Sequence, residues 1–260
     1  MAERVFIIFK GYFLSFLSFF SFFAGAAAAA GAAAGAAAGA AAPATGAAAS
    51  SCFSCLLLLA RMLITSSTVY LFLPWNLFLA FVPYWITGWM IRNVSIIENK
   101  IKLLIALAAW LLFIPNSFYI ITDFFHLSHP VATGFRSAPK WFDLLLIFSF
   151  AWNGILCGVI SLRRVEIVIS LISGKSFSIL LVFGVMWLSA FGIYIGRFLR
   201  YNSWDVITDP FSLAGEIVNM IIHPFENSYT WGMTLCYAVF MTLVYFTIKK
   251  LSESFCMPAK

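Results

Sequence analysis

The sequence predicts an all-α fold, a polytopic bundle of transmembrane helices. Of the 260 residues, 63% are hydrophobic and only 10% are charged, whereas soluble domains carry about 25% charged residues. Apolar runs of about 20 residues, the length that crosses a bilayer as a helix, recur along the chain. So few polar side chains cannot cover a water-facing surface, which excludes a soluble enzyme, a nucleic-acid-binding domain and a disordered protein. The net charge of +6 is scattered, so no nucleic-acid partner is expected.

Apolar runs predict about seven spans, within a range of six to eight. They cover residues 5–23, 52–72, 75–91, 101–121, 143–160, 178–199 and 229–248. The membrane bundle proper is predicted over residues 52–248 and is followed by a tail, 249–260. The connection 161–177 mixes basic and apolar residues and predicts an amphipathic helix on the membrane surface. Residues 211–222, just after Pro210, predict a similar helix on the opposite face.

The N-terminal region, residues 1–51, combines a Phe-rich run with an Ala/Gly-rich segment. Residues 24–49 hold 19 Ala and 5 Gly in 26 positions. One interpretation is a helix with small faces, because Gly31, Gly35 and Gly39 repeat the spacing that lets helices approach closely. The other is that these letters stand in for unidentified side chains. Both stay open, so the side of the N-terminus does too.

Basic residues alternate between the two sides of the predicted bundle. Cytoplasmic connections are enriched in Lys and Arg. The connections 92–102 and 161–177 and the tail hold nine bases against three acids. We therefore expect these segments on the cytoplasmic side and the loops 122–142 and 200–228 on the extracytoplasmic side.

A polar stripe marks the end of the fourth predicted span. Asn116, Tyr119, Asp123 and His126 are spaced by three, four and three residues, which places them on one side of a helix. Pro115 should kink that helix near its outer end. Because a polar stripe is costly in lipid, it should face protein or water.

A second polar group ends the sixth predicted span. Arg197 and Arg200 are helical neighbours, Asp205 follows them, and Asp143 opens the fifth span. The predicted topology brings these residues to the same membrane face as the stripe. The sequence therefore predicts one candidate polar cluster, made of Asn116, Tyr119, Asp123, His126, Asp143, Arg197, Arg200 and Asp205.

This cluster has two interpretations. As a functional site, its arginines suit phosphate or carboxylate groups, and its Asp and His side chains suit a divalent metal or a proton relay. As a structural network, the arginines are neutralised by Asp123 or Asp143, or they reach the headgroups. A zinc site from Asp123, His126 and His129 is a further alternative. The sequence identifies no catalytic set, cofactor or metal.

Arg61 lies inside the second predicted span. A cation at that depth must pair or reach the interface. Glu166 and a lipid phosphate are its candidate partners.

Three segments in order resemble a family of bacterial integral membrane proteins, domain of unknown function 1361. They are the run from Pro115 to Leu127, the segment from Trp141 to Asp143 and the run from Gly196 to Asp205. The resemblance covers about residues 52–248 and implies a multi-pass protein of the bacterial cytoplasmic membrane. It implies no activity and gives no residue a metal or catalytic role.

Three functions fit these observations, and all have the lipid bilayer as a partner. The first is a non-catalytic subunit of a larger membrane assembly, with other membrane protein subunits as partners. It requires no specific chemical role for any residue. An ion or small-solute carrier or channel would use the extracytoplasmic Asp/His/Arg site. A membrane-embedded enzyme acting on lipid headgroups would use His126 as a proton shuttle and the arginines as a phosphate clamp.

Overall fold

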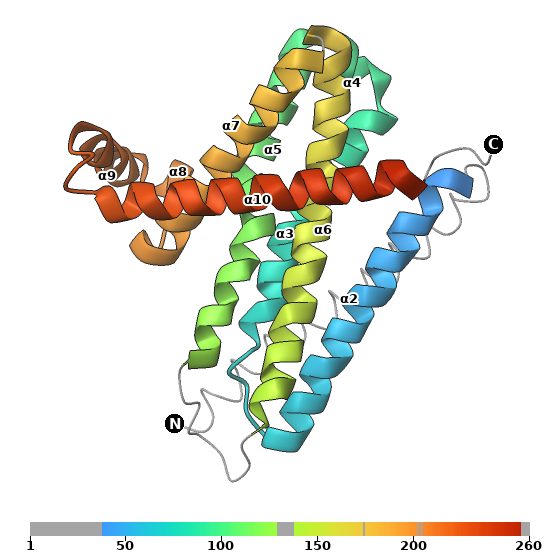
Figure 1. Ribbon diagram of the computed structural model, residues 1–260, viewed down its shortest axis with the longest axis vertical. Coiled ribbons are helices and arrows are strands. Elements are labelled where there is room, and N and C mark those ends of the chain that lie inside the picture. The colour runs from blue at the N-terminus through green and yellow to red at the C-terminus, as the bar shows by residue number, and fades with distance from the viewer. Residues whose placement is uncertain (1–37, 129–137, 174, 202, 204, 256–260) are drawn as a thin grey trace. The chain divides into compact units, whose positions relative to one another are not determined.

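The computed structural model describes residues 38–128, 138–173, 175–201, 203 and 205–255, and within them every regular element is a helix (Figure 1). This confirms the predicted all-α class. The elements in order are α2 (Ala38–Thr65), α3 (Phe72–Arg92), α4 (Val94–Glu98), α5 (Lys100–Tyr119), the 3₁₀ helix η2 (Ile120–Ser128), α6 (Lys140–Ser173), α7 (Lys175–Tyr194), the π-helix η3 (Ile195–Leu199), α8 (Asp205–Thr208), α9 (Pro210–Ile222) and α10 (Ser228–Phe255).

The chain divides into two compact units. The first consists of Met1–Leu77 and Asp123–Asn153, so its described part contains α2, the start of α3, most of η2 and the first part of α6. The second consists of Phe78–Thr122 and Gly154–Lys260 and contains most of α3, the start of η2, the rest of α6 and the remaining helices. The helix α6 runs from one unit into the other.

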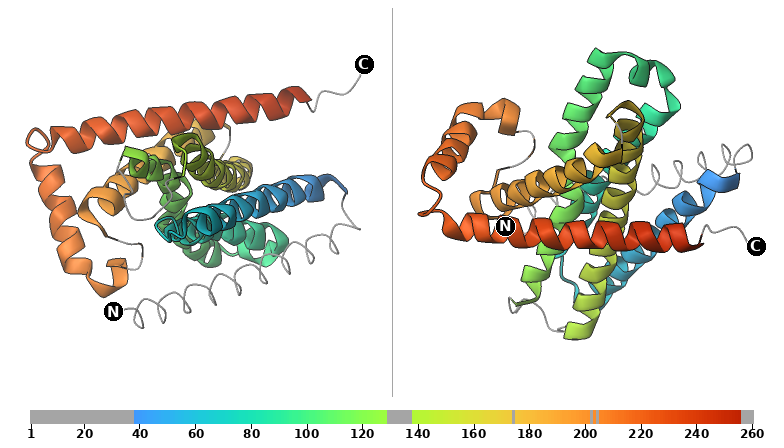
Figure 2. Two further views of the ribbon diagram at one scale, coloured as in Figure 1. Left: turned by 90° about the horizontal axis from the view of Figure 1, so that it is seen from below. Right: turned by 45° about the horizontal axis from the view of Figure 1, so that its top comes forward.

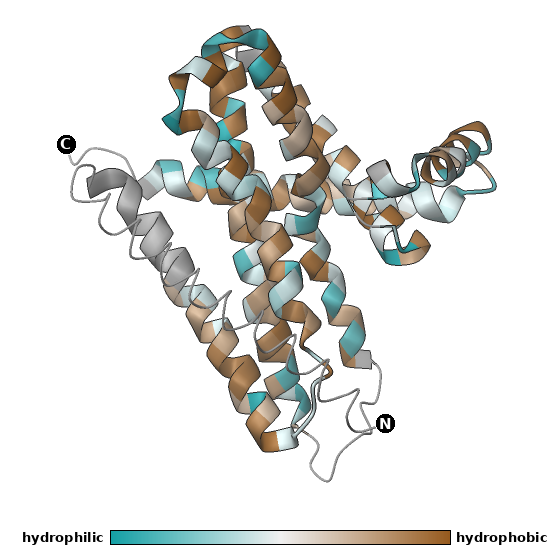
Figure 3. Cartoon of the chain, turned by 180° about the vertical axis from the view of Figure 1, so that it is seen from behind, coloured by the Kyte–Doolittle hydropathy of each residue, from teal (hydrophilic) through white to brown (hydrophobic). Residues whose placement is uncertain are grey.

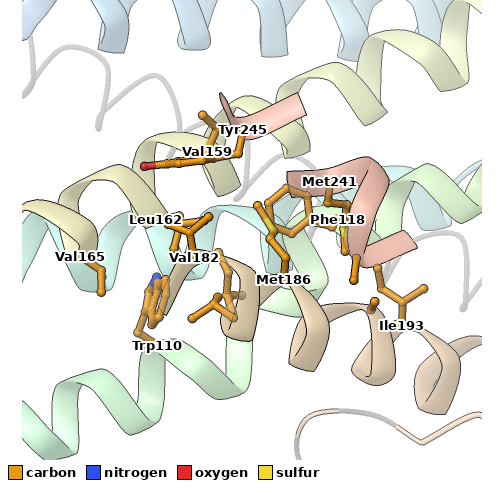
Figure 4. Packing of buried hydrophobic residues seen from close by; sticks show 14 residues of the cluster. Trp110, Phe118, Val159, Leu162, Val165, Val182, Met186, Ile193, Met241 and Tyr245 are labelled. Atoms are coloured by element: carbon orange, nitrogen blue, oxygen red, sulfur yellow. The ribbon is translucent and has the colours of Figure 1, made fainter. Parts of the chain in front are cut away.

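The second unit has a continuous apolar core. In this unit α7 packs along both α5 and α10 (Figures 1 and 2). One cluster of buried side chains draws on four helices (Figure 4). It includes Trp110 and Phe118 of α5, Leu162 of α6, Met186 of α7 and Tyr245 of α10. Close packing of this kind, over side chains from four helices, fixes their rotation about their own axes.

Among the residues that the structure describes, four helices are long and apolar enough to cross a membrane: Lys100–Leu127, Lys140–Ile172, Phe177–Leu199 and Ser228–Ser254. They correspond to the predicted spans 101–121, 143–160, 178–199 and 229–248. Figure 3 shows hydrophobic residues along most of these helices, with hydrophilic residues gathered in the turns around α4.

The other predicted spans have different outcomes. The apolar part of the second ends early, because α2 stops at Thr65 and the chain turns through Ser66 at a φ of 52°. It leaves a shorter apolar helix, Ala49–Thr65. Residues 75–91 are helical within α3, but Pro83 and several Trp and Tyr residues interrupt its apolar character. The span 5–23 lies outside the described residues, so the total of about seven stays a prediction.

The connection 161–177 is not a separate surface helix, contrary to the prediction. Helix α6 continues through it to Ser173 because no Gly or Pro occurs between Ser161 and that residue. Val165, Glu166 and Val168 are buried on the continued helix. The helix predicted at 211–222 is present as α9, with Pro210 in its first turn and the Asp209 side chain accepting a hydrogen bond from the Ser212 amide.

The helix that carries the predicted polar stripe changes its pitch. It is α-helical to Tyr119 and then continues as the 3₁₀ helix η2. The Thr122 hydroxyl donates to the Tyr119 carbonyl at 2.7 Å across this junction. A 3₁₀ helix has 3.0 residues per turn and not 3.6, so the residues of the stripe do not all follow one α-helical spacing.

Candidate functional site

In the first unit, the carboxylate of Asp143 is held by an arginine and a tyrosine. Arg61 of α2 donates from Nε to Oδ1 at 2.6 Å and from Nη2 to Oδ2 at 3.2 Å, and the Tyr70 hydroxyl donates to Oδ2 at 3.3 Å. The Arg61 side chain is 3% exposed and that of Asp143 is 13% exposed. The guanidinium also lies 4.4 Å from the centre of the Tyr70 ring, within cation–π range.

Tyr70 lies in the turn between α2 and α3. Burial and the neighbouring Asp143 carboxylate raise the pKa of its phenol to about 12. The hydroxyl therefore stays protonated at neutral pH and serves as a donor to Asp143.

Asp123 and His126 lie in the same unit as Asp143. Asp123 is almost fully buried, and Asn76 of α3 donates to its Oδ2 at 2.9 Å. His126 is half-buried, with its ring centre 4.7 Å from that of Phe72. At a spacing of three residues the two side chains share one side of the 3₁₀ helix. Asp123, His126 and Asp143 thus belong to one unit, and the arginine that pairs with Asp143 is Arg61.

The remaining residues of the predicted cluster belong to the second unit. Asn116 donates to the Ser203 hydroxyl at 3.0 Å, which joins α5 to the segment after η3. A Cβ added at Gly196 would lie 3.3 Å from the Tyr119 ring, and one at Gly192 would lie 3.1 Å from Pro115. Helices α5 and α7 approach closely at both points because these glycines lack side chains.

The arginines of this group mark an irregular end of α7. Arg197 lies in the π-helix η3, and Arg200 is exposed and ends it in the left-handed conformation, at a φ of 62°. Asp205 accepts a hydrogen bond from the Thr208 hydroxyl at 3.0 Å within α8. The predicted cluster therefore divides between the two units, and the approach of Asp123 to Arg197 stays a prediction.

The most completely satisfied ionisable residue is Glu166, which sequence reasoning had placed in a surface connection. Its carboxylate is 3% exposed. It accepts hydrogen bonds from Arg163 Nη1 at 2.5 Å, the Ser178 hydroxyl at 3.0 Å, the Tyr245 hydroxyl at 2.5 Å and Lys249 Nζ at 2.6 Å. These donors come from α6, α7 and α10, so one carboxylate joins three helices. We refer to these five residues as the Glu166 network.

Glu166 had been one of the two candidate partners of Arg61, together with a lipid phosphate. The ion-pair partner of Arg61 is instead Asp143, and Glu166 pairs with Arg163 and Lys249. Local signals for the Glu166 network were present in the sequence: Arg163 and Glu166 are three apart, and Tyr245 and Lys249 are four apart, which places each pair on one helix face.

No group of three or more His, Cys, Asp or Glu side chains suited to a metal ion occurs among the residues that the structure describes. The zinc alternative required His129, which lies outside those residues. The candidate site is thus a set of ion pairs and hydrogen bonds between helices. Such pairs neutralise charges that are buried away from water, where unpaired ions are costly.

A family model matches residues 75–244 of the chain. The chain belongs to the family described as "Protein of unknown function (DUF1361)". All three segments that carried the resemblance lie inside the match, whereas Arg61, Tyr70 and Lys249 lie outside it. No match was found among curated proteins or among solved structures. The family description names no activity, so a function for this DUF1361 protein has to be argued from its side chains.

Proposed function

We propose that this DUF1361 protein is a non-catalytic subunit of a larger membrane protein assembly. The observation that carries the proposal is the state of its buried charges. The Glu166 carboxylate accepts four hydrogen bonds from the chain's own side chains, and Asp143 accepts three. A carboxylate engaged to this degree has little capacity left for a substrate, whereas it ties helices together well.

The surface of the second unit supports the same proposal. Helix α9 has 13 residues, too few to cross a bilayer, and it exposes Phe211, Val218 and Ile222. An apolar face on a helix that does not span is suited to a neighbouring subunit or to the headgroup boundary.

The experiment is gentle extraction of the full chain from its native membrane, followed by mass determination with the detergent contribution subtracted. We expect particles several times the mass of one chain that contain at least one other membrane protein. Repeating the extraction in a harsher detergent is the control, because a true assembly should then dissociate. A monodisperse single copy under the gentle condition would overturn the proposal.

A carrier or channel is the second candidate, and a pair of helix irregularities favours it. The 3₁₀ helix η2 follows α5, the π-helix η3 follows α7, and Tyr119 and Gly196 are close to each other beside these two junctions. Interrupted helices within membranes often line polar pathways, and π-helical turns often occur at functional sites. The enzyme alternative has no comparable observation in its favour.

Ion flux into liposomes tests the carrier. For a carrier, the reconstituted wild-type chain conducts above protein-free liposomes, and Asp123→Asn abolishes the flux while the helical circular dichroism is unchanged. Ser254→Ala, an exposed substitution on α10, serves as a matched control. Absence of flux in the wild type, or flux unchanged in Asp123→Asn, would remove this candidate.

A further inference from the structure

Two adjacent arginines of α6 have opposite surroundings. Arg163 donates to Glu166 and also lies 3.6 Å from Glu253. Arg164 faces α3 instead, where its Nη1 donates to the Tyr84 carbonyl at 3.0 Å and its guanidinium lies 4.2 Å from the centre of the Tyr84 ring. Within the described part of the chain, Arg164 forms no ion pair.

A second arginine converges on the same place from the end of α3. Arg92 is the last residue of that helix, and its Nε donates to the Gly88 carbonyl at 3.0 Å. A Cβ on Gly88 would lie 3.4 Å from Arg164 Nη1 and 3.5 Å from Arg92 Nη2. Two guanidinium groups are therefore gathered around one point, and among the described residues Arg92 has no acidic partner either.

The backbone carbonyls and the C-terminal end of the α3 dipole offset only part of this charge, because each contributes partial charges and not a full anion. Because both nitrogens lie within 3.5 Å of the Gly88 Cβ position, they are less than about 7 Å apart. Two like charges repel each other at such a separation, and a counter-ion between them would relieve the repulsion. Glu166, the buried acid nearest in sequence, is fully used by Arg163 and Lys249. Among the described residues, no acidic side chain therefore forms an ion pair with either arginine.

The position of the arginine pair indicates where a counter-ion would come from. Helix α6 has 34 residues and begins at Lys140, and about 20 residues suffice to cross the hydrocarbon core, so Arg164 lies near or beyond the far boundary of that core. Trp89 of α3 is exposed one turn before Arg92, as tryptophans at the headgroup level are. The apolar side chains of Met90, Ile96, Leu103 and Val168 pack together beneath this end of the unit.

We propose that Arg92 and Arg164 bind the phosphate of an anionic glycerophospholipid at the membrane boundary. A phosphodiester oxygen pair matches the fork of an arginine, and two forks can hold one phosphate from two sides. A zwitterionic lipid fits less well because its ammonium group would bring a third cation to the site. The bound lipid then acts as a bridge between the end of α3 and α6.

The test is lipid binding to the full chain in detergent, measured by native mass spectrometry during titration with phosphatidylglycerol or phosphatidylcholine. We expect tight retention of one phosphatidylglycerol and weaker binding of phosphatidylcholine. The double substitution Arg92→Gln and Arg164→Gln should weaken phosphatidylglycerol binding about tenfold or more. The matched control is Lys100→Gln with Lys102→Gln, which removes the same charge from exposed positions on α5 and should leave the binding within about twofold.

A third variant keeps both arginines. Gly88→Asp places a carboxylate between the two guanidinium groups, so it should also abolish phosphatidylglycerol retention while leaving the chain folded. Competition with inorganic phosphate separates a lipid site from a site for a free anion: millimolar phosphate should not displace the lipid. Equal binding by the arginine and lysine double variants, retention in Gly88→Asp, or displacement by inorganic phosphate would each overturn the proposal.

Discussion

Glu166 and Asp143 lie on the same helix, α6, yet their surroundings differ. Glu166 faces two cations, a phenol and a hydroxyl and is 3% exposed, whereas Asp143 faces one cation and one phenol and is 13% exposed. Arg61 Nη1 is buried without a hydrogen-bond partner among the described residues. The Glu166 carboxylate therefore has hydrogen-bond donors from four side chains, whereas the ion pair of Asp143 with Arg61 leaves one buried donor of Arg61 without an acceptor. We therefore expect Glu166 to join its helices more firmly than Asp143 does.

The largest effect is expected for Glu166→Gln. This change removes the negative charge that faces Arg163 and Lys249 and leaves two cations around a neutral amide. Because breaking a buried ion pair costs about 3–5 kcal/mol, we expect the free energy of unfolding in mixed micelles to fall by about that amount. Glu253→Gln is the control, since its carboxylate is 47% exposed and its loss should cost under about 1 kcal/mol.

A smaller loss is expected for Asp143→Asn. The amide oxygen of Asn still accepts from Arg61 or Tyr70, and only one cation loses its partner. We expect the free energy of unfolding to fall by about 1–3 kcal/mol. A loss as large as that of Glu166→Gln would contradict the difference between the two carboxylates.

Replacing Tyr245 or Tyr70 with Phe removes a single hydrogen bond from each carboxylate, so the two variants can be compared directly. Tyr245→Phe removes the 2.5 Å bond to Glu166, and Tyr70→Phe removes the 3.3 Å bond to Asp143. The first should cost about 1.5–3 kcal/mol, as for bonds to charged groups, and the second about 1 kcal/mol or less, because the Phe ring keeps the cation–π contact with Arg61. Thermal unfolding of the two variants side by side gives the order, and the reverse order would count against it.

An effect about as small as that of Tyr70→Phe is expected for Ser178→Ala. This change removes the one neutral hydroxyl that α7 offers to Glu166, at 3.0 Å, while both cations remain. We expect a loss of about 1 kcal/mol in the free energy of unfolding. A loss above that of Tyr245→Phe would show that α7 is joined to α6 through this bond more strongly than the distances indicate.

Much of the fold could be predicted from the sequence, because apolar runs of membrane length are a direct physical requirement. Four spans correspond to helices long enough to cross. The prediction for 161–177 was wrong because Arg163, Arg164 and Lys175 were taken as evidence for a separate helix on the membrane surface. No Gly or Pro occurs between Ser161 and Ser173, so α6 continues through that stretch. A stretch that is both charged and unbroken can equally be a helix whose charges are buried in pairs.

The site was harder to predict. The residue types of the stripe were identified, but the spacing of its residues did not predict the change to a 3₁₀ helix after Tyr119. Arg61 was recognised as needing a partner, yet Asp143 is 82 residues away in the chain. Which of several acids an arginine meets depends on the rotation of both helices, and this is decided by tertiary packing.

The central claim is that the buried charges of this DUF1361 protein serve to join its helices. A double-mutant cycle of Glu166→Gln and Lys249→Gln, with the free energy of unfolding measured in mixed micelles, tests it most directly. We expect a coupling above about 1 kcal/mol, as for residues that share one network of hydrogen bonds and ion pairs. Additive losses with no coupling, or a gain in stability on replacing Glu166, would contradict the claim and point to a residue kept for activity at the expense of the fold.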